Sequence, residues 1–206
     1  MITRTRAITL PDSAGEAVEI DMGGWPVVES FSPPAGDCLV CLTDLSHRPK
    51  AIVQGPAATG LGLSRPGQAS WNGQVLVGRA KADKAIVLDL SGPVEPQWPD
   101  SHYTDVTDGW VLLAIWGPRA LDVVQRLVSV DVERPDIDGP VFFATGAHGI
   151  RVQLFNLRGR RPGFVIACDL SQGQNLFDAC VRAGHQFDMK LAGVKPFNEW
   201  LGNHVG

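Results

Sequence analysis

The chain has 206 residues, of which 44% are hydrophobic and 19% are charged, and its formal net charge is −4. This composition is typical of a globular protein with one domain, or two closely joined halves, and a sizeable core. The negative charge gives no reason to expect nucleic acid or an anionic membrane surface as a partner.

The N-terminal segment, residues 1–10, has positive charge but no long apolar stretch behind it. This pattern predicts that the chain has no signal peptide. No stretch approaches the roughly 18 apolar residues that a membrane helix needs. We therefore expect a soluble cytoplasmic protein that does not bind membranes.

The first 37 residues contain one candidate strand, Ala17 to Ile20, between turn-forming glycines and prolines. We expect residues 1–37 to pack as an N-terminal segment on a core that the rest of the chain forms. No separate function is predicted for this segment.

Cys38 and Cys41 have CxxC spacing, but the residues around them are apolar and predict an extended strand. Side chains three residues apart in a strand point to opposite faces, which suits neither a disulfide nor a shared metal. No second CxxC is present to complete a zinc site. The sequence therefore favours structural cysteines over a redox pair, and no metal is expected.

One pattern occurs twice: an Asp-aliphatic-hydroxyl triplet, an apolar run and then Gly-Pro-x-Ala. The copies cover residues 44–58 and 105–120, a separation at which repeated sequence indicates repeated supersecondary structure. Each apolar run predicts a buried strand, and each Gly-Pro predicts a helix start, because proline suits the first helical position. The pattern therefore predicts a duplicated strand-to-helix unit.

Apolar runs at residues 74–79 and 85–90 predict a β-hairpin, and the proline-rich residues 91–103 predict a surface linker. Periodicity predicts the following elements in the second half: a helix at 119–128, strands at 141–145, 150–157 and 163–168, and a helix capped by Ser171 and ended by Gly184.

This order predicts an α+β fold with helices on one face of a largely antiparallel sheet. We expect two halves, residues 38–100 and 101–206. The tail after Phe187 is too broken to assign.

Asp44, His47 and Arg48 form the most polar cluster in an otherwise apolar region. His47 beside a carboxylate suits a general base, and Arg48 suits the binding of a substrate carboxylate. The alternative is that Asp44 and Ser46 bond to turn backbone while His47 and Arg48 are ordinary surface groups. Local bonding of this kind favours the alternative, and the second copy keeps the triplet but not the His-Arg pair.

The segment from Arg158 to Gly163 contains three arginines between two predicted strands. As a hairpin tip it would be a solvated turn, yet it is the best anion-binding candidate in the chain. No phosphate loop, dinucleotide fingerprint or nucleophile elbow occurs in the sequence.

The segment from Leu42 to Arg48, followed by an apolar strand and Gly55-Pro56-x-Ala, resembles the glycine-cleavage T-protein (aminomethyltransferase) family. Val77-x-Arg79 resembles the next strand of that family, and the resemblance extends over residues 38–195. It implies a duplicated, folate-binding α+β fold that transfers one-carbon units to tetrahydrofolate.

Family enzymes carry an acidic pair before the Val-x-Arg strand, where this chain has Gly73 and Gln74. A family Glu that holds the pterin falls on Arg160, and a second Glu falls on Val165. Because the pterin presents N–H donors and arginine accepts no hydrogen bonds, these changes argue against the usual folate chemistry. The candidates for folate or substrate binding are Asp44, His47, Arg48, Gln74, Arg79 and Arg160, and no catalytic residue is assigned.

The chain also ends near the point where the C-terminal domain of a T-protein would begin. In this it is similar to the gamma subunit of heterotetrameric sarcosine oxidases, in which the T-protein-like fold serves as an assembly partner. The resemblance implies a non-catalytic subunit in one-carbon or amine metabolism, partnered by a larger subunit or by a second copy. The alternative is a tetrahydrofolate-dependent aminomethyl- or methyltransferase in which Asp83 or Asp89 replaces the acidic pair.

Overall fold

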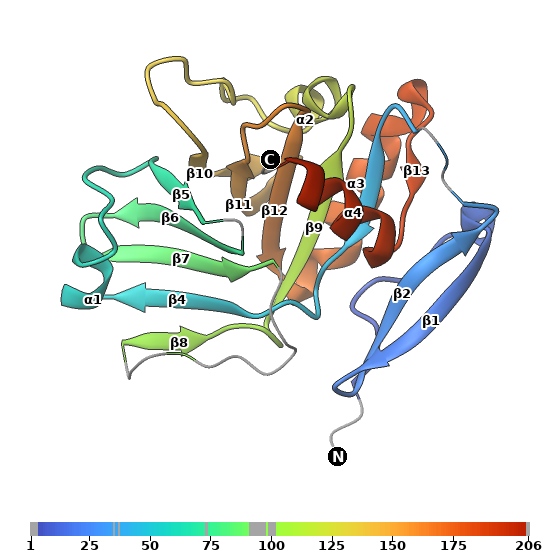
Figure 1. The fold of residues 1–206 in the computed structure, drawn as a ribbon, viewed down its shortest axis with the longest axis horizontal. Coiled ribbons are helices and arrows are strands. Elements are labelled where there is room, and N and C mark those ends of the chain that lie inside the picture. Colours follow the sequence, from blue (N-terminus) through green and yellow to red (C-terminus); the bar gives the residue numbers. More distant parts are fainter. Residues whose placement is uncertain are drawn as a thin grey trace.

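The computed structural model describes residues 4–34, 36, 38–72, 74–90, 98 and 102–204 (Figure 1). These residues form a two-stranded hairpin, a six-stranded sheet and a five-stranded sheet, with helices packed on the sheets. The predicted α+β class is confirmed. Gly73 and most of the predicted linker, residues 91–97 and 99–101, lie outside the described part of the chain.

The strands are β1 (Glu16–Met22), β2 (Trp25–Ser32), β3 (Cys41–Asp44), β4 (Lys50–Gln54), β5 (Ala69–Trp71), β6 (Val75–Lys81), β7 (Lys84–Asp89), β8 (Tyr103–Asp105), β9 (Trp110–Trp116), β10 (Val141–Ala147), β11 (Ile150–Asn156), β12 (Gly163–Asp169) and β13 (Lys190–Leu191). The helices are α1 (Pro56–Thr59), α2 (Ala120–Leu127), α3 (Gly173–Gly184) and α4 (Val194–His204), with 3-10 turns η1 (Asp12–Ala14), η2 (Leu170–Gln172) and η3 (His185–Phe187).

The two large sheets face each other across a shared core. The six-stranded sheet has the order β10-β11-β12-β9-β3-β13, and the five-stranded sheet has the order β5-β6-β7-β4-β8. Helices α2 and α3 cover one face of the six-stranded sheet, whereas α4, β2 and the five-stranded sheet pack on its other face. The expectation of one sheet with helices on a single face is therefore wrong, because a second sheet and α4 bury the opposite face.

Strand β9 shows why its sequence is apolar throughout. Val111, Leu113 and Ile115 pack with α2 and α3, and the alternate residues pack with the second sheet and α4. Since successive side chains of a strand point to opposite faces, a strand covered on both sides needs apolar residues at every position.

The duplicated segment forms two strand crossovers that lie side by side. The first runs from β3 in one sheet to β4 in the other, and the second runs from β8 back to β9. Because β3 pairs antiparallel with β9, and β4 pairs antiparallel with β8, the two copies run in opposite directions. The repeat therefore joins the two sheets twice.

The Asp-x-hydroxyl triplets shape the turns of these crossovers. Asp44 Oδ1 accepts a hydrogen bond from the Ser46 backbone N–H at 2.9 Å, and Asp105 Oδ1 accepts one from Thr107 at 2.7 Å. The structural interpretation of the triplets is confirmed. They are paired Asx turns, in which a carboxylate replaces a backbone acceptor.

Each triplet hydroxyl also reaches the other copy. Ser46 Oγ accepts a hydrogen bond from the Leu112 N–H at 3.2 Å, and Thr107 Oγ1 accepts one from the Lys50 N–H at 3.0 Å. In each case the N–H donor lies in the first half of the strand that follows the other copy's turn: Leu112 in β9 and Lys50 in β4. These reciprocal bonds satisfy buried backbone donors that neither sheet pairs at that point.

Gly193 lies between β13 and α4, against the backbone of β2. A Cβ atom there would overlap the carbonyl of Glu29 and stand 2.5 Å from the backbone nitrogen of Ser30. We expect Gly193→Ala to lower the free energy of unfolding, measured in urea, by about 2 to 3 kcal/mol through overpacking. Gly202→Ala in α4 is the matched control, because a Cβ there meets nothing within 4 Å and raises helix propensity. Equal stability of the two variants would contradict this packing.

Cys38 and Cys41 form a disulfide, with Cα atoms 6.2 Å apart. The prediction that their spacing does not suit a disulfide is wrong, because strand β3 begins only at Cys41 and the two intervening residues form a bend. The bonded loop holds neighbouring elements. Its Leu39 carbonyl accepts a hydrogen bond from the Arg119 N–H at 2.9 Å, just before α2.

Reducing this disulfide with dithiothreitol is expected to destabilise the protein by about 2 kcal/mol, as loop-closure entropy predicts for so short a loop. The corresponding fall in Tm, measured by calorimetry, is about 5 °C for a chain of this size. A Cys38→Ser/Cys41→Ser variant should not respond to the reductant. Cys168→Ser, which removes a buried free cysteine, should respond like the wild type. An unchanged Tm in the wild type would contradict the prediction.

The predicted second-half elements match α2, β10, β11, β12 and α3 closely, with two differences. Ser171 does not cap α3, because it lies inside η2 and the residue before the helix is Gln172, which makes no side-chain cap. The unassigned tail forms β13 and α4, whose Phe197 and Trp200 are buried in the shared core.

Candidate functional site

The turn between β3 and β4 and the first residue of β4 carry three basic side chains into the interior. His47 is 3% exposed, Arg48 is 4% exposed and Lys50 is fully buried. These three residues are called the buried basic cluster below. The favoured interpretation of His47 and Arg48 as surface groups is wrong. The crossover passes from one sheet to the other, and both the N-terminal segment and α4 cover it.

Lys50 closes the turn from inside. Its Nζ donates hydrogen bonds to the carbonyls of Ser46 and Arg48, each at 2.8 Å. Burial lowers the pKa of Lys50 to about 7, although the carboxylates of Asp44 and Asp105 act in the opposite direction. Lys50 is not among the site residues that the sequence predicts. The available signal was a lysine at the entrance of an apolar strand, a pattern that also fits a solvated strand end.

Arg48 connects the turn to two other elements. Its Nη2 donates to Asn198 Oδ1 of α4 at 2.9 Å. Burial lowers the pKa of Arg48, and the carboxylate of Asp89, the last residue of β7, opposes that shift. Arg48 therefore has a structural role between the second sheet and α4.

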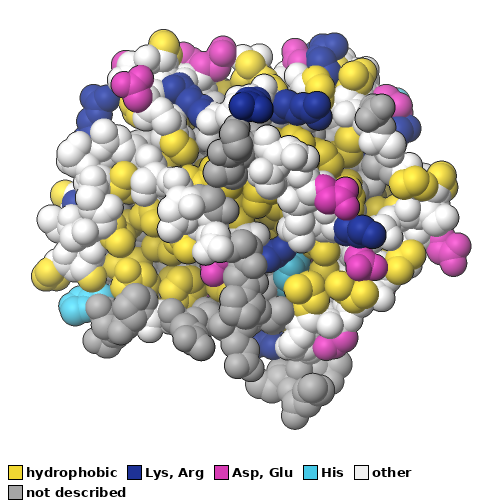
Figure 2. Space-filling view, viewed as in Figure 1, with side chains coloured by type: hydrophobic (Ala, Val, Ile, Leu, Met, Phe, Trp, Pro, Cys, Tyr) yellow, Lys and Arg dark blue, Asp and Glu magenta, His cyan; other side chains and the backbone are white. Residues whose placement is uncertain are grey.

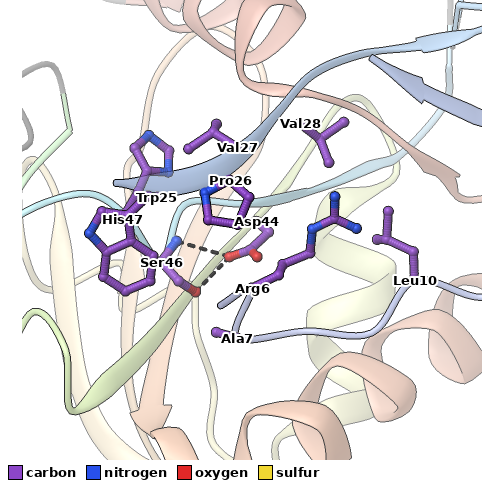
Figure 3. Close-up of a pocket in the computed structure, with 10 residues that line it drawn as sticks. All are labelled: Arg6, Ala7, Leu10, Trp25, Pro26, Val27, Val28, Asp44, Ser46 and His47. Carbon is purple, nitrogen blue, oxygen red and sulfur yellow. Dashed lines mark hydrogen bonds between the residues drawn. The ribbon is translucent and has the colours of Figure 1, made fainter. Parts of the chain in front are cut away.

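His47 lines a small cavity with Asp44, Ser46 and Trp25, beneath the N-terminal segment (Figure 3). The cavity volume is about 20 Å³, enough for about one water molecule. Among the described residues, His47 Nε2 has no hydrogen-bond partner.

Burial, together with Arg48 and Lys50, lowers the pKa of His47 to about 3, so the imidazole is neutral near pH 7. Burial raises the pKa of Asp44, and the hydrogen bonds from Ser46 oppose that shift. A histidine with so low a pKa is a weak base, and the cavity beside it leaves no room for a substrate. The geometry does not support His47 as a general base.

The structure places the other three candidates on separate elements. Gln74 is exposed just before β6, and Arg160 is exposed in the loop between β11 and β12. Arg79 is buried, and its guanidinium donates to the carbonyls of Ala58 and Ala82, so it braces α1 and the β6–β7 turn. Only Asp44, His47 and Arg48 come together, because they share one turn.

Two kinds of feature are absent from the described part of the chain. No three His, Cys, Asp or Glu side chains there are grouped to hold a metal ion. No helix among these residues combines the length and the hydropathy needed to span a bilayer.

Two sequence comparisons relate the chain to known proteins. The family model of the GCVT N-terminal domain matches residues 74–199. A curated aminomethyltransferase from Shouchella clausii (strain KSM-K16) is 28% identical over 162 residues, which cover 62% of this chain and 43% of that relative. The chain thus spans less than half the length of the curated relative that it matches.

Two solved structures share the fold. A chain of the heterotetrameric sarcosine oxidase from Corynebacterium sp. U-96, in complex with pyrrole 2-carboxylate, matches with a TM-score of 0.60 and 19% identity, over 74% of this chain and 87% of that one. The glycine cleavage system aminomethyltransferase T from Bartonella henselae matches with a TM-score of 0.62 and 17% identity, over 89% of this chain and 57% of that one. At these identities the matches establish the fold, and the resemblance drawn from the sequence is confirmed. Because the family model covers more than half of the residues, the chain belongs to the family of the GCVT N-terminal domain.

Proposed function

We propose that this chain is a non-catalytic subunit of a larger amine-oxidising or one-carbon enzyme in the cytoplasm. The observation that carries the proposal is the buried basic cluster. The polar interior of the repeat is filled by His47, Arg48 and Lys50, and the space left beside His47 is about 20 Å³. In this role residues 38–100 and 101–206 act as two halves, with residues 1–37 packed on them.

The chemistry of these residues argues against pterin recognition. Arg48 and Lys50 only donate hydrogen bonds, as the N–H groups on a pterin edge also do. At the two positions where the family resemblance expects acidic groups, the chain has Gln74 and Arg160, which carry no carboxylate. A one-carbon transfer to folate would therefore lack its usual acceptors.

The structural match to a chain of a heterotetramer supports a subunit role. The match covers 74% of this chain and 87% of the sarcosine oxidase chain, so the matched oxidase chain is shorter than this chain. The aminomethyltransferase T is covered over only 57% of its length. The likeness in fold to a chain of a heterotetrameric oxidase is what supports a subunit role for the present chain.

Calorimetric titration with tetrahydrofolate tests the proposal, with quenching of the six tryptophans as a second readout. We expect no micromolar binding to this chain, and clear binding to an aminomethyltransferase titrated in parallel. Micromolar affinity that is lost in Gln74→Ala and His47→Gln variants would overturn the non-catalytic role. Stoichiometric co-purification with a larger flavoprotein from the source cells would support it.

The second candidate function is a tetrahydrofolate-dependent transferase, and the position of Asp89 favours it. This carboxylate acts on Arg48, and the next residue, Leu90, donates its N–H to the Gln74 carbonyl at 2.9 Å. Asp83 is exposed in the β6–β7 turn. In a transferase, Asp89→Asn should abolish folate-dependent release of the one-carbon unit and Asp83→Asn should not. No activity in the wild type would exclude this candidate.

A further inference from the structure

The loop joining β11 to β12, residues 157–162, is called the arginine loop below. It carries Arg158, Arg160 and Arg161, which the sequence marks as the best anion-binding candidates. Figure 2 shows several Lys and Arg side chains, with Asp and Glu side chains among them, along the upper rim of the molecule, the rim on which Figure 1 places this loop. The proposed subunit role does not involve these arginines.

Arg158 holds the base of the loop. It has a positive φ of 45°, its N–H donates to Asn156 Oδ1 at 3.1 Å, and its guanidinium donates to the carbonyls of Arg134, at 2.6 Å, and Ile137. Asn156 is buried and donates to the Val132 carbonyl at 2.9 Å. Because the guanidinium of Arg158 is bonded to backbone carbonyls, Arg158 fixes the loop, and only Arg160 and Arg161 at its tip are available to bind an anion.

The tip presents two adjacent arginines that form no ion pair with any carboxylate in the described part of the chain. Arg160 and Arg161 are exposed, and neither forms an ion pair or a side-chain hydrogen bond with the described residues. In contrast, Arg4, Arg119 and Arg134 each pair with an aspartate at 2.6–2.8 Å. On a chain with a net charge of −4, this pair creates a local positive region.

A hollow with a mixed apolar and polar lining lies beside the tip. Its volume is about 530 Å³, and its lining includes Leu121 of α2, Pro162 and Phe164, with Arg160 among the polar residues around them. Glu133 also contributes to the lining, and its carboxylate opposes the attraction that Arg160 exerts on an anion. This arrangement suits a ligand in which carboxylates stand next to an apolar side chain.

We propose that the arginine loop and this hollow form a docking surface for an acidic segment of a protein partner. Carboxylates of the segment pair with Arg160 and Arg161, and a neighbouring apolar side chain enters the hollow. Guanidinium groups bind carboxylates through paired hydrogen bonds, and the local positive charge of Arg160 and Arg161 attracts an acidic segment that the negative remainder of the chain repels. The identification of the partner as a larger subunit rests on the proposed function.

The test uses the full chain and a fluorescent peptide of alternating glutamate and leucine, followed by anisotropy at about 0.1 M salt, where charges more than about 10 Å apart are largely screened. Arg160→Glu/Arg161→Glu should weaken binding by about tenfold or more, and added salt should weaken binding to the wild type. The matched control is Arg151→Glu/Arg182→Glu, which reverses two exposed arginines elsewhere and makes the same change in net charge. It should bind within about twofold of the wild type, because screened long-range charge contributes little.

Equal weakening in both double variants would overturn the proposal, since the peptide would then respond only to net charge. Displacement of the peptide by stoichiometric inorganic phosphate would also overturn it, and would make the loop a small-anion site. The proposed function can fail separately. A chain that binds tetrahydrofolate refutes the subunit role whatever the peptide does, and a chain that binds neither ligand refutes only the docking surface.

Discussion

Lys50→Ala is expected to lower the free energy of unfolding by about 4 to 5 kcal/mol. Lys50 is fully buried, and its Nζ donates to the carbonyls of Ser46 and Arg48. Its removal leaves two buried acceptors without a donor, at about 1 to 1.5 kcal/mol each, the lower part of the usual range. Truncation of the buried stem adds a cavity cost of about 2 kcal/mol. Urea unfolding followed by tryptophan fluorescence gives the measurement.

Two further variants separate these contributions. Lys50→Met keeps the apolar stem and loses only the hydrogen bonds, so we expect a loss of about 2 to 3 kcal/mol. Lys195→Ala removes an exposed lysine of α4 and should change stability by less than about 0.5 kcal/mol. If Lys50→Ala were as stable as Lys195→Ala, the hydrogen bonds of Lys50 would not stabilise the turn between β3 and β4.

The pH dependence of Lys50 supplies an independent check. Its folded pKa is about 7, below the ordinary lysine value of 10.5, so between these values the unfolded chain binds the additional proton. Stability therefore rises with pH through this window, and the rise is absent from Lys50→Met. The difference between the two proteins should be larger near pH 9 than near pH 7. An equal difference at both values would mean that the ammonium is not desolvated.

The local structure of the repeat could be predicted from its sequence, and its placement could not. An Asp followed two residues later by a hydroxyl specifies an Asx turn through neighbouring atoms, so the turns at Asp44 and Asp105 follow from local chemistry. The sheet to which each following strand belongs depends on pairing with distant strands. Apolar periodicity carries no such information.

The burial of His47 and Arg48 could not be predicted for the same reason. Polar side chains in a turn are usually exposed, and only distant segments reverse that rule here. Arg48 is bonded to Asn198, 150 positions later in the chain, and His47 lies under Trp25 of β2. The binding roles assigned to Gln74, Arg79 and Arg160 by family resemblance stay predictions.

Helix α4 was not predicted because its sequence contains weak helix formers. Pro196 and Gly202 lie within it, and glycine in a helix interior costs about 1 kcal/mol relative to alanine. Pro196 is tolerated in the first turn, where its missing N–H has no intrahelical partner. Burial of Phe197 and Trp200 against the six-stranded sheet, rather than propensity, stabilises the helix.

Acidification is expected to destabilise the wild type through His47. Its pKa is about 3 in the folded chain, whereas the ordinary histidine value is 6.5, so the unfolded chain takes up the proton first as the pH falls. Stability from this residue is complete above pH 6.5 and is lost progressively down to about pH 3. The full loss is roughly 5 kcal/mol, at 1.36 kcal/mol for each pKa unit.

The comparison of the wild type with His47→Gln isolates this contribution. Asp44, whose pKa is raised by burial, contributes in the opposite direction, but it is present in both proteins and cancels in the difference. Urea unfolding at several pH values between about 4 and 7 should show a wild-type stability that falls more steeply than that of the variant, by up to about 1.4 kcal/mol per pH unit. His185→Gln, which removes an exposed histidine of η3, should follow the wild-type curve. If His47→Gln also follows the wild-type curve, the prediction is wrong. The imidazole of His47 would then take up a proton in the folded chain, and water would reach the turn beside the cavity.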